Sequence, residues 1–307
     1  MNMISPQGRP AVALIAGPTA SGKSAHALAL AERTGGVIVN ADSAQVYRDL
    51  RILSARPSAE EEARVPHRLF GYVDGADACS AAQWAGDARA AIAAAHAEGR
   101  LPILVGGTGM YIRTLLDGIA PVPEIDPEVR ATVRALDVAA ARAALEREDA
   151  EAAARIGPRD TARIARALEV VRSTGQSILI WRARRSGGIA DGITLQPLVI
   201  LPPTELLYAR CDARAAAMIA AGALDEAAAL KARRLDHALP VMRAIGVPPL
   251  LRHLNGEITL DAALRQLQQD TRNYAKRQKT WIRHQFPEAW PHVPFVDSNE
   301  VHPLRAV

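Results

Sequence analysis

The chain of 307 residues contains 49% apolar and 23% charged residues and has a formal net charge of +4. This apolar share can form a large core in one enlarged domain or two, and the sequence shows neither a signal-peptide h-region nor a run of about 18 apolar residues. The two cysteines, Cys79 and Cys211, lack the spacing of a disulfide framework or a zinc site. We therefore expect a soluble, cytoplasmic protein that does not associate with membranes.

The first predicted elements are a buried strand at residues 12–16, a glycine-rich loop and an Ala/Leu-rich helix. The loop fits the pattern G-x-x-x-x-G-K-[ST] with Gly17, Pro18, Thr19, Ala20, Ser21, Gly22, Lys23 and Ser24. Its backbone amides and the helix N-terminus can point at one anion, while Lys23 adds a positive charge and Ser24 a hydroxyl for Mg²⁺. The order strand, loop, helix predicts a polyphosphate site and disfavours a mere turn with a solvated lysine.

A second buried strand is predicted at residues 36–40, and Asp42 follows it. Because ligands of open α/β sheets bind beyond the carboxyl ends of the strands, Asp42 is expected at the mouth of the phosphate site. A carboxylate there can act as a general base, and it can equally cap the next helix. The residues alone leave both interpretations open.

A third strand is predicted at residues 101–105, before a glycine cluster at 106–109, and a fourth at residues 198–201. An Ala-rich helix at 81–98 leads into the third strand, which is a crossover typical of parallel sheets. We therefore predict an α/β fold with a P-loop NTPase-like parallel sheet core and helices on both faces.

A mainly helical domain is predicted to be inserted between the third and fourth strands. Proline and glycine clusters mark its ends, which gives a first core segment at 10–120, the insertion domain at 121–195 and a second core segment at 196–307. Between residues 155 and 185 the insert has eight arginines and two acids. Arg159, Arg163 and Arg166 are spaced to share one helical face, opposite apolar residues that include Ile164.

A second basic segment lies near the C-terminus, where residues 271–284 contain no acid and include two aromatic residues, Tyr274 and Trp281. Its cations are Arg272, Lys276, Arg277, Lys279 and Arg283. A single basic stripe usually marks a solvated face. Two such stripes in separate regions favour a nucleic-acid-binding surface.

Taken together, the motifs resemble those of the bacterial tRNA dimethylallyltransferases. They are the loop at 17–24, Asp42-Ser43-Ala44-Gln45-Val46-Tyr47, Pro66-His67-Arg68, Gly106-Gly107-Thr108-Gly109-Met110-Tyr111 and Ala275-Lys276-Arg277-Gln278-Lys279-Thr280-Trp281. The resemblance implies transfer of a dimethylallyl group from dimethylallyl diphosphate to the N6 amine of the adenine 3′ of the tRNA anticodon. It also implies a monomeric enzyme that uses Mg²⁺ and grips the anticodon stem-loop with the helical insert.

By the same resemblance, Asp42 accepts the amine proton, the loop at 17–24 holds the diphosphate, Ser24 binds Mg²⁺ and Arg243 assists the leaving group. The residues implied to meet tRNA are Asp42, Ser43, Ala44, Gln45, Thr108, Arg130, Ala162, Arg163, Ile164, Ala165, Arg166, Lys276, Arg277, Gln278, Trp281 and Arg283.

The sequence departs from the family pattern at a few positions. Val247-Pro248-Pro249 stands where tyrosine and polar residues are usual, and Asp49 and Leu53-Ser54 replace glycine and a Gly-Thr pair. Two functions from other classes stay open as alternatives: a P-loop small-molecule kinase, and a non-catalytic RNA-binding protein with a degenerate loop. Transfer of phosphate from ATP would favour the first, and tRNA binding without any product would favour the second.

Overall fold

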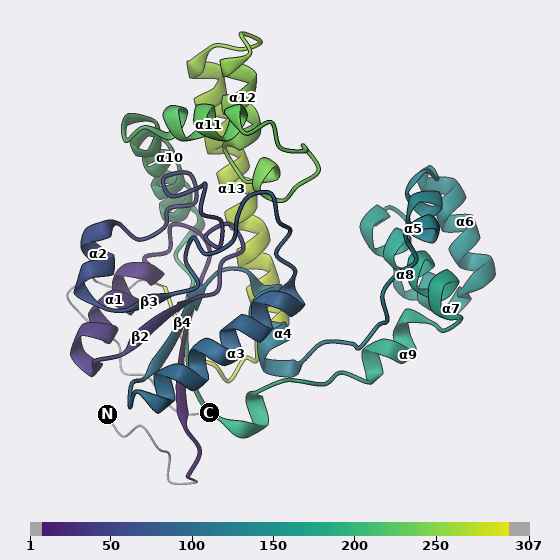
Figure 1. The fold of residues 1–307 in the computed structure, drawn as a ribbon, viewed down its shortest axis with the longest axis horizontal. Coiled ribbons are helices and arrows are strands. Elements are labelled where there is room, and N and C mark those ends of the chain that lie inside the picture. The colour runs from purple at the N-terminus through teal and green to yellow at the C-terminus, as the bar shows by residue number, and fades with distance from the viewer. Residues whose placement is uncertain (1–7, 295–307) are drawn as a thin grey trace. The chain divides into compact units, whose positions relative to one another are not determined.

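The computed structural model describes residues 8–294, which form two compact units (Figure 1). One unit contains residues 8–115 and 189–294, and the other contains Leu116–Gly188. The insertion predicted at residues 121–195 corresponds to the second unit, with both boundaries shifted toward the N-terminus. Residues 189–195 belong to the first unit because they lead into a strand that begins at Thr194.

The first unit is built on a six-stranded sheet in the order β3-β2-β4-β1-β5-β6, and every neighbouring pair is parallel. The strands are β1 (Ala11–Ala16), β2 (Val37–Asn40), β3 (His67–Arg68), β4 (Pro102–Gly106), β5 (Thr194–Ile200) and β6 (His292–Val293). The four strands predicted from the sequence are β1, β2, β4 and β5. The strands β3 and β6 were not predicted, because each has two residues and lies at an edge.

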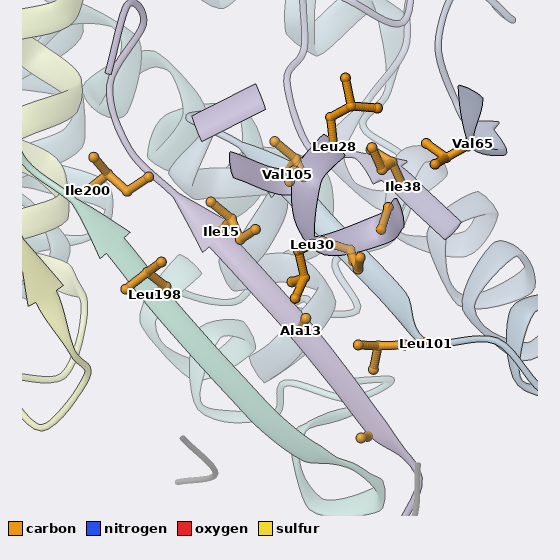
Figure 2. Packing of buried hydrophobic residues seen from close by; sticks show 14 residues of the cluster. Ala13, Ile15, Leu28, Leu30, Ile38, Val65, Leu101, Val105, Leu198 and Ile200 are labelled. Carbon is orange, nitrogen blue, oxygen red and sulfur yellow. The ribbon is translucent and has the colours of Figure 1, made fainter. Parts of the chain in front are cut away.

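The central strands are buried on both faces, as their continuous apolar runs predict. On one face, Ile15 and Val105 pack with Leu28 and Leu30 of helix α1 (Lys23–Thr34), as Figure 2 shows. Successive side chains of a strand point to opposite faces, so Leu14, between Ala13 and Ile15, faces the other side. There α3 (Ala81–Ala97) packs on β2 and β4, and helices therefore cover both faces of the parallel sheet.

The remaining helices of the first unit do not all alternate with strands, since four of them follow one another between β5 and β6. They are α2 (Ala59–Arg64), α4 (Gly109–Asp117, which continues into the second unit), α10 (Thr204–Ala220), α11 (Ala223–Ala232), α12 (Val247–Leu254) and α13 (Leu260–Gln285), with 3-10 turns at Ala190–Gly192 and Val241–Arg243. The hydroxyl of Thr259 accepts a hydrogen bond from Ala262 N at the start of α13. Between residues 8 and 294, no helix is both long and apolar enough to cross a lipid bilayer.

The second unit is a small helical bundle with its own core. Its helices are α5 (Pro127–Arg134), α6 (Val138–Glu148), α7 (Ala150–Arg155), α8 (Thr161–Thr174) and α9 (Ile178–Ala183). An aspartate or serine caps the N-terminus of each of them, as Asp160 does for α8. The helix α8 begins after Arg159, so the prediction that Arg159 shares a helical face with Arg163 and Arg166 is wrong.

Because β4 is central, its side chains should carry a large share of the stability of the first unit. We expect Leu104→Ala to lower the free energy of unfolding by about 2–5 kcal/mol, since Leu104 is completely buried and its truncation leaves a cavity. Urea-induced unfolding measures the change. The matched substitution Leu206→Ala, at a leucine that is 38% exposed, should change it by less than about 0.5 kcal/mol. Equal effects of the two would contradict this packing.

Candidate active site

The glycine-rich loop connects β1 to α1 at the carboxyl end of the sheet. Gly22 immediately precedes the helix with φ of 92°, a left-handed conformation that favours glycine. Lys23 folds back over the loop, and its Nζ donates a hydrogen bond to the carbonyl of Pro18 at 3.2 Å. The loop therefore closes on itself below the N-terminus of α1, where free backbone amides favour an anion.

Two cations converge on this loop from different elements. Burial lowers the pKa of Lys23 to about 8; the carboxylate of Asp42 raises it and Arg214 lowers it further. The guanidinium of Arg214, from α10, donates a hydrogen bond to Thr19 Oγ1, and burial lowers its pKa as well. Two desolvated positive charges beside helix amides favour an anion, because the negative charge of the ligand replaces the interactions with water that the cations lost on burial.

Sequence reasoning did not identify Arg214. The residue lies on the same face of α10 as three buried residues. If Leu207 is position i, then Cys211 is i+4, Arg214 is i+7 and Ala215 is i+8. The available signal was a pair of arginines four residues apart, Arg210 and Arg214, in an alanine-rich helix. Neither belongs to a dense run of cations such as those at 155–185 and 271–284, so the charge distribution did not mark them.

Gln278 of α13 fixes the tip of the loop. Its side-chain oxygen accepts a hydrogen bond from Thr19 N at 2.8 Å, and its amide nitrogen donates to the carbonyl of Gly107 at 2.9 Å. A Cβ atom at Gly107 would lie 2.3 Å from this amide, which explains one glycine of the cluster. Gln278 is 5% exposed, so a direct contact of its side chain with RNA, as the resemblance implied, is not open to it.

Asp42 lies just beyond β2 and is held from both sides. Its backbone N–H donates to Asn40 Oδ1 at 2.8 Å, and its Oδ1 accepts from Ala44 N at 3.0 Å. The next residue, Ser43, donates its N–H to Thr108 Oγ1 at 3.0 Å. No helix follows before residue 59, so the alternative that Asp42 caps a helix is wrong. Its carboxylate instead lines a cavity.

Two cavities meet at the loop, and Arg214 lines both of them. The larger, about 540 Å³, is lined by the loop residues 20–24 and by Gln45, Glu61 and His67, among others. The smaller, about 310 Å³, has Asp42 and Thr19 in its wall together with the apolar side chains of Met218 and Leu267. The arrangement places the anion-binding loop on one side of Arg214 and, on the other, a pocket with both polar and apolar walls that contains the carboxylate of Asp42.

The second cavity also collects several residues singled out from the sequence. Ser43, Ala44, Arg243 and Arg277 lie in its wall. Arg243 belongs to the turn Val241–Arg243 and lies with Asp42 rather than in the larger cavity that holds the loop. Tyr274 is a further lining residue, and the guanidinium of Arg277 lies 5.7 Å from the centre of its ring.

The C-terminal basic segment divides into structural and exposed members. Arg272 pairs with Asp212 at 2.6 Å, and the buried Lys279 donates to Pro202 O at 2.7 Å. The remaining residues behave differently: Lys276 and Arg283 are exposed, and Trp281 packs where a Cβ at Gly109 would meet its ring. Part of the predicted RNA-binding stripe therefore holds α13 in place.

In the second unit, the predicted RNA-contact residues lie at the start of α8 and in α5. Arg163 and Arg166 are exposed but pair with Asp160 at 3.2 Å and Glu169 at 3.7 Å. Ile164 is completely buried, so its side chain cannot contact RNA, and this implied role is wrong. The remaining three positions lie at different depths: Ala162 is exposed, and Ala165 and Arg130 are half-buried.

Comparison with known proteins decides the family. Residues 45–285 match the family model described as IPP transferase, and residues 10–74 match a second model described as Isopentenyl transferase. The chain belongs to the IPP transferase family. It is 62% identical over 281 residues to the tRNA dimethylallyltransferase of Sphingopyxis alaskensis, covering 91% of this chain and 92% of that protein. The enzyme of the same name from Erythrobacter litoralis is 57% identical, with 94% and 93% covered.

Solved structures of this family share the fold. A tRNA isopentenylpyrophosphate transferase from Bacillus halodurans is 32% identical, with a TM-score of 0.66 and coverage of 92% of this chain and 89% of that one. A eukaryotic dimethylallyltransferase described as acting on tRNA is 27% identical, with a TM-score of 0.77 and coverage of 89% and 69%. The P-loop-like parallel core of the IPP transferase family is thus the fold of this chain.

The lowered pKa of Lys23 predicts how anion binding responds to pH. Because the free ammonium loses its proton near pH 8, we expect inorganic diphosphate to bind more weakly as the pH rises from 7 to 9.5, by up to about tenfold per unit above the pKa. Isothermal titration calorimetry measures the affinity. Lys23→Arg stays protonated throughout and is the control, since the ionisation of diphosphate itself affects both proteins equally. Parallel pH profiles of the two proteins would refute the assignment.

Proposed function

We propose that this protein transfers a dimethylallyl group from dimethylallyl diphosphate to the N6 amine of the adenine 3′ of the anticodon in tRNA. The observation that carries the proposal is the junction at Thr19 and Arg214, where the anion-binding loop adjoins a pocket that contains Asp42 and an apolar wall with Met218 and Leu267. A prenyl diphosphate has these two parts, an anion and an apolar chain. The names of the relatives, tRNA dimethylallyltransferases, agree with it.

The residues divide the chemistry between them. The loop amides, Lys23 and Arg214 bind the diphosphate and stabilise the negative charge that grows on it as the carbon–oxygen bond breaks. The dimethylallyl carbon lies toward the apolar wall formed by Met218 and Leu267. The adenine N6 forms the new carbon–nitrogen bond and passes a proton to the carboxylate of Asp42, which acts as general base. The products are the N6-alkylated base and diphosphate.

Mg²⁺ is proposed as the metal of the donor site. Ser24 presents an exposed hydroxyl in the first turn of α1 and lines the larger cavity. Among residues 8–294, no three or more His, Cys, Asp or Glu side chains form a metal-binding cluster. This sparse donor set fits Mg²⁺, which is commonly bound by substrate phosphates, water and one or two protein ligands. Bound there, it would neutralise charge on the leaving group.

The anticodon stem-loop is proposed as the part of tRNA that binds. A base in a single-stranded loop can leave the stack and enter a pocket. The target adenine would have to do so to reach Asp42, because Asp42 lies in the wall of the second cavity. Exposed cations in both units, such as Lys276 and Arg163, can contact the phosphates of the stem, because a surface ion pair like Arg163–Asp160 is weak and exchanges readily. A monomeric, cytoplasmic enzyme stays a prediction.

The deciding experiment is mass spectrometry of tRNA nucleosides after incubation with dimethylallyl diphosphate and Mg²⁺. The proposal expects the mass of a dimethylallyl group on adenosine. Transfer of phosphate from labelled ATP to a small molecule instead would favour the kinase alternative, and binding of tRNA without any product would favour an RNA-binding protein.

Replacing the general base should slow the chemical step. Asn at position 42 can still accept the hydrogen bond from Ala44 N, so we expect Asp42→Asn to keep the fold and to reduce the single-turnover rate by about 10²- to 10⁴-fold. Rapid-quench measurement with saturating donor and tRNA gives the rate, and filter binding gives the tRNA affinity, which should change little. A variant as fast as wild type would remove Asp42 from the chemistry.

Phosphate contacts should make tRNA binding depend on salt. We expect log affinity to fall with log salt concentration by roughly 0.7 to 0.9 per contacted phosphate, and Arg163→Glu or Lys276→Glu to reduce this slope by about one each. Arg252→Glu is the control, because Arg252 is an exposed arginine paired with Glu257 outside both basic segments. If all three variants keep the wild-type slope, the two stripes are solvated faces and tRNA is held elsewhere.

A further inference from the structure

The helix α11 lies outside both cavities but holds the segment that lines one of them. Glu226, in its first turn, accepts hydrogen bonds from three successive backbone N–H groups: Arg51 at 2.5 Å, Ile52 at 2.9 Å and Leu53 at 2.8 Å. Hydrogen bonds from amides to an ionised carboxylate are about twice as strong as neutral ones. One side chain of α11 therefore fixes the conformation of three consecutive residues.

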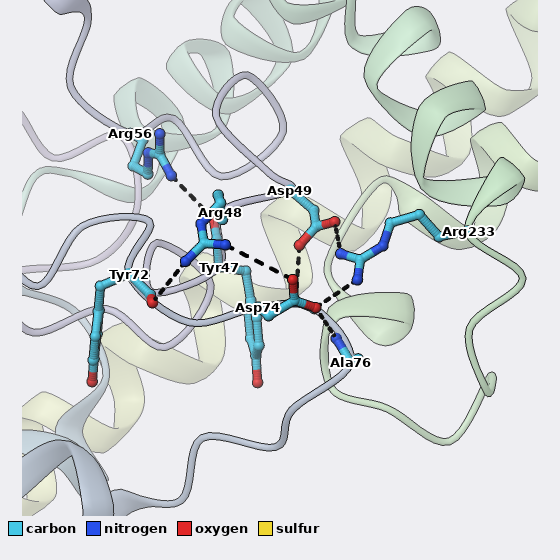
Figure 3. Close-up of polar contacts among 9 residues, drawn as sticks. Tyr47, Arg48, Asp49, Arg56, Tyr72, Asp74, Ala76 and Arg233 are labelled. Carbon is cyan, nitrogen blue, oxygen red and sulfur yellow. Dashed lines mark hydrogen bonds and ion pairs between the residues drawn. The ribbon is translucent and has the colours of Figure 1, made fainter.

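Arg233, at the C-terminal end of the same helix, makes a second attachment. Its guanidinium forms ion pairs with Asp49 and with Asp74, at 2.5 Å for the latter (Figure 3). Both carboxylates also accept backbone hydrogen bonds, Asp49 from Gly75 at 2.8 Å and Asp74 from Ala76 at 2.9 Å. Arg233 thus ties the segment around Asp49 to the loop around Asp74.

The segment held in this way, residues 42–57, contains neither helix nor ladder strand. Its shape rests on isolated backbone bonds, such as Arg56 N to Arg51 O at 3.0 Å, and on side-chain bonds to its own carbonyls, such as Gln45 Nε2 to Ala55 O at 2.9 Å. The segment begins with Asp42 and supplies Tyr47 and Leu53 to the smaller cavity. An irregular segment without its own hydrogen-bond ladder needs such external anchors to keep one conformation.

The chain that leaves α11 lines the same cavity from another side. After Arg233 it continues to Pro240 and Arg243, which lie in the cavity wall with Asp42. Gly246 follows, and a Cβ there would lie 2.8 Å from the side chain of Leu53, so the two walls are in contact. The first turn of α11 therefore holds one wall of the pocket that contains Asp42, and the chain that follows α11 forms another wall.

We propose that Glu226 and Arg233 are positioning residues, which act through the segment 42–57 to hold Asp42 and the wall of the acceptor pocket in the reactive geometry. The inference rests on the proposed function. It assigns them no contact with donor or acceptor. Their loss leaves the phosphate loop in place, because the contacts of Lys23, Arg214 and Gln278 that hold the loop do not involve α11 or the segment 42–57.

The test compares Glu226→Gln with Asp225→Asn, the matched loss of a carboxylate in the same helical turn at the exposed Asp225. Single-turnover transfer to tRNA, donor affinity and melting temperature are measured for both, well below the melting temperature. A displacement of about 1 Å in an active site can cost on the order of 100-fold in rate, so we expect a 10- to 100-fold slower transfer for Glu226→Gln. Donor affinity should stay within about twofold of wild type, and Asp225→Asn should behave as wild type.

A second pair separates positioning from general stability. Arg233→Ala should also slow transfer at unchanged donor affinity, Arg233→Lys should recover part of the rate, and Arg252→Ala should have no effect although it too removes an exposed ion pair. The inference is overturned if Glu226→Gln and Arg233→Ala lower only the melting temperature, or if donor affinity falls in parallel with the rate. Failure of wild type itself to prenylate tRNA would instead reject the proposed function.

Discussion

The site depends on one electrostatic arrangement: two cations, the buried Lys23 and the half-buried Arg214, beside the N-terminus of a helix. Burial lowers the pKa of both groups, so the protein without an anion holds positive charge in a poorly solvated place. The fold tolerates this because the loop carbonyl of Pro18 and the hydroxyl of Thr19 accept hydrogen bonds from them. An anionic ligand at the loop would offset this cost, so the unligated protein is already arranged to favour an anion.

Around this arrangement, the residue proposed as general base is carried by a segment with little regular structure. Asp42 follows the end of β2, and the segment that it opens is shaped by Asn40, Thr108 and the anchors on α11. Because the backbone after β2 leaves the sheet, the carboxylate of Asp42 can line a pocket. Asp49, which departs from the family's usual glycine, takes part in this support through its contacts with Arg233 and Gly75.

Sequence patterns predicted the parts whose signal is local. The four central strands have continuous apolar runs, and the phosphate loop has a fixed spacing, so both could be located before the structure was known. The edge strand β3 could not, because its two residues pair only through β2. Nor could the charge run on α13 be divided into paired and exposed cations, since Asp212, the partner of Arg272, lies 60 residues earlier in the chain.

Contacts from distant helices were the other part beyond reach. Arg214 and Glu226 act on residues more than 170 positions away, and each is one of several charged residues in its helix, with nothing in the sequence to set it apart. Hydrophobic periodicity reports which face of such a helix is buried but not which polar group that face meets. The pocket of Asp42 is therefore assembled by residues whose individual sequence signals are weak.

The hydrogen bonds of Gln278 have a thermodynamic consequence. One helix, α13, holds the amide of Thr19 through Gln278 and also presents Tyr274 and Arg277 to the pocket of Asp42. A displacement of α13 on occupation of that pocket would move the tip of the phosphate loop with it. By linkage, if a ligand in that pocket changed the affinity of the loop for an anion by some factor, the anion would change the affinity of the pocket for its ligand by the same factor. The side-chain amide of Gln278 would carry this coupling between the two sites.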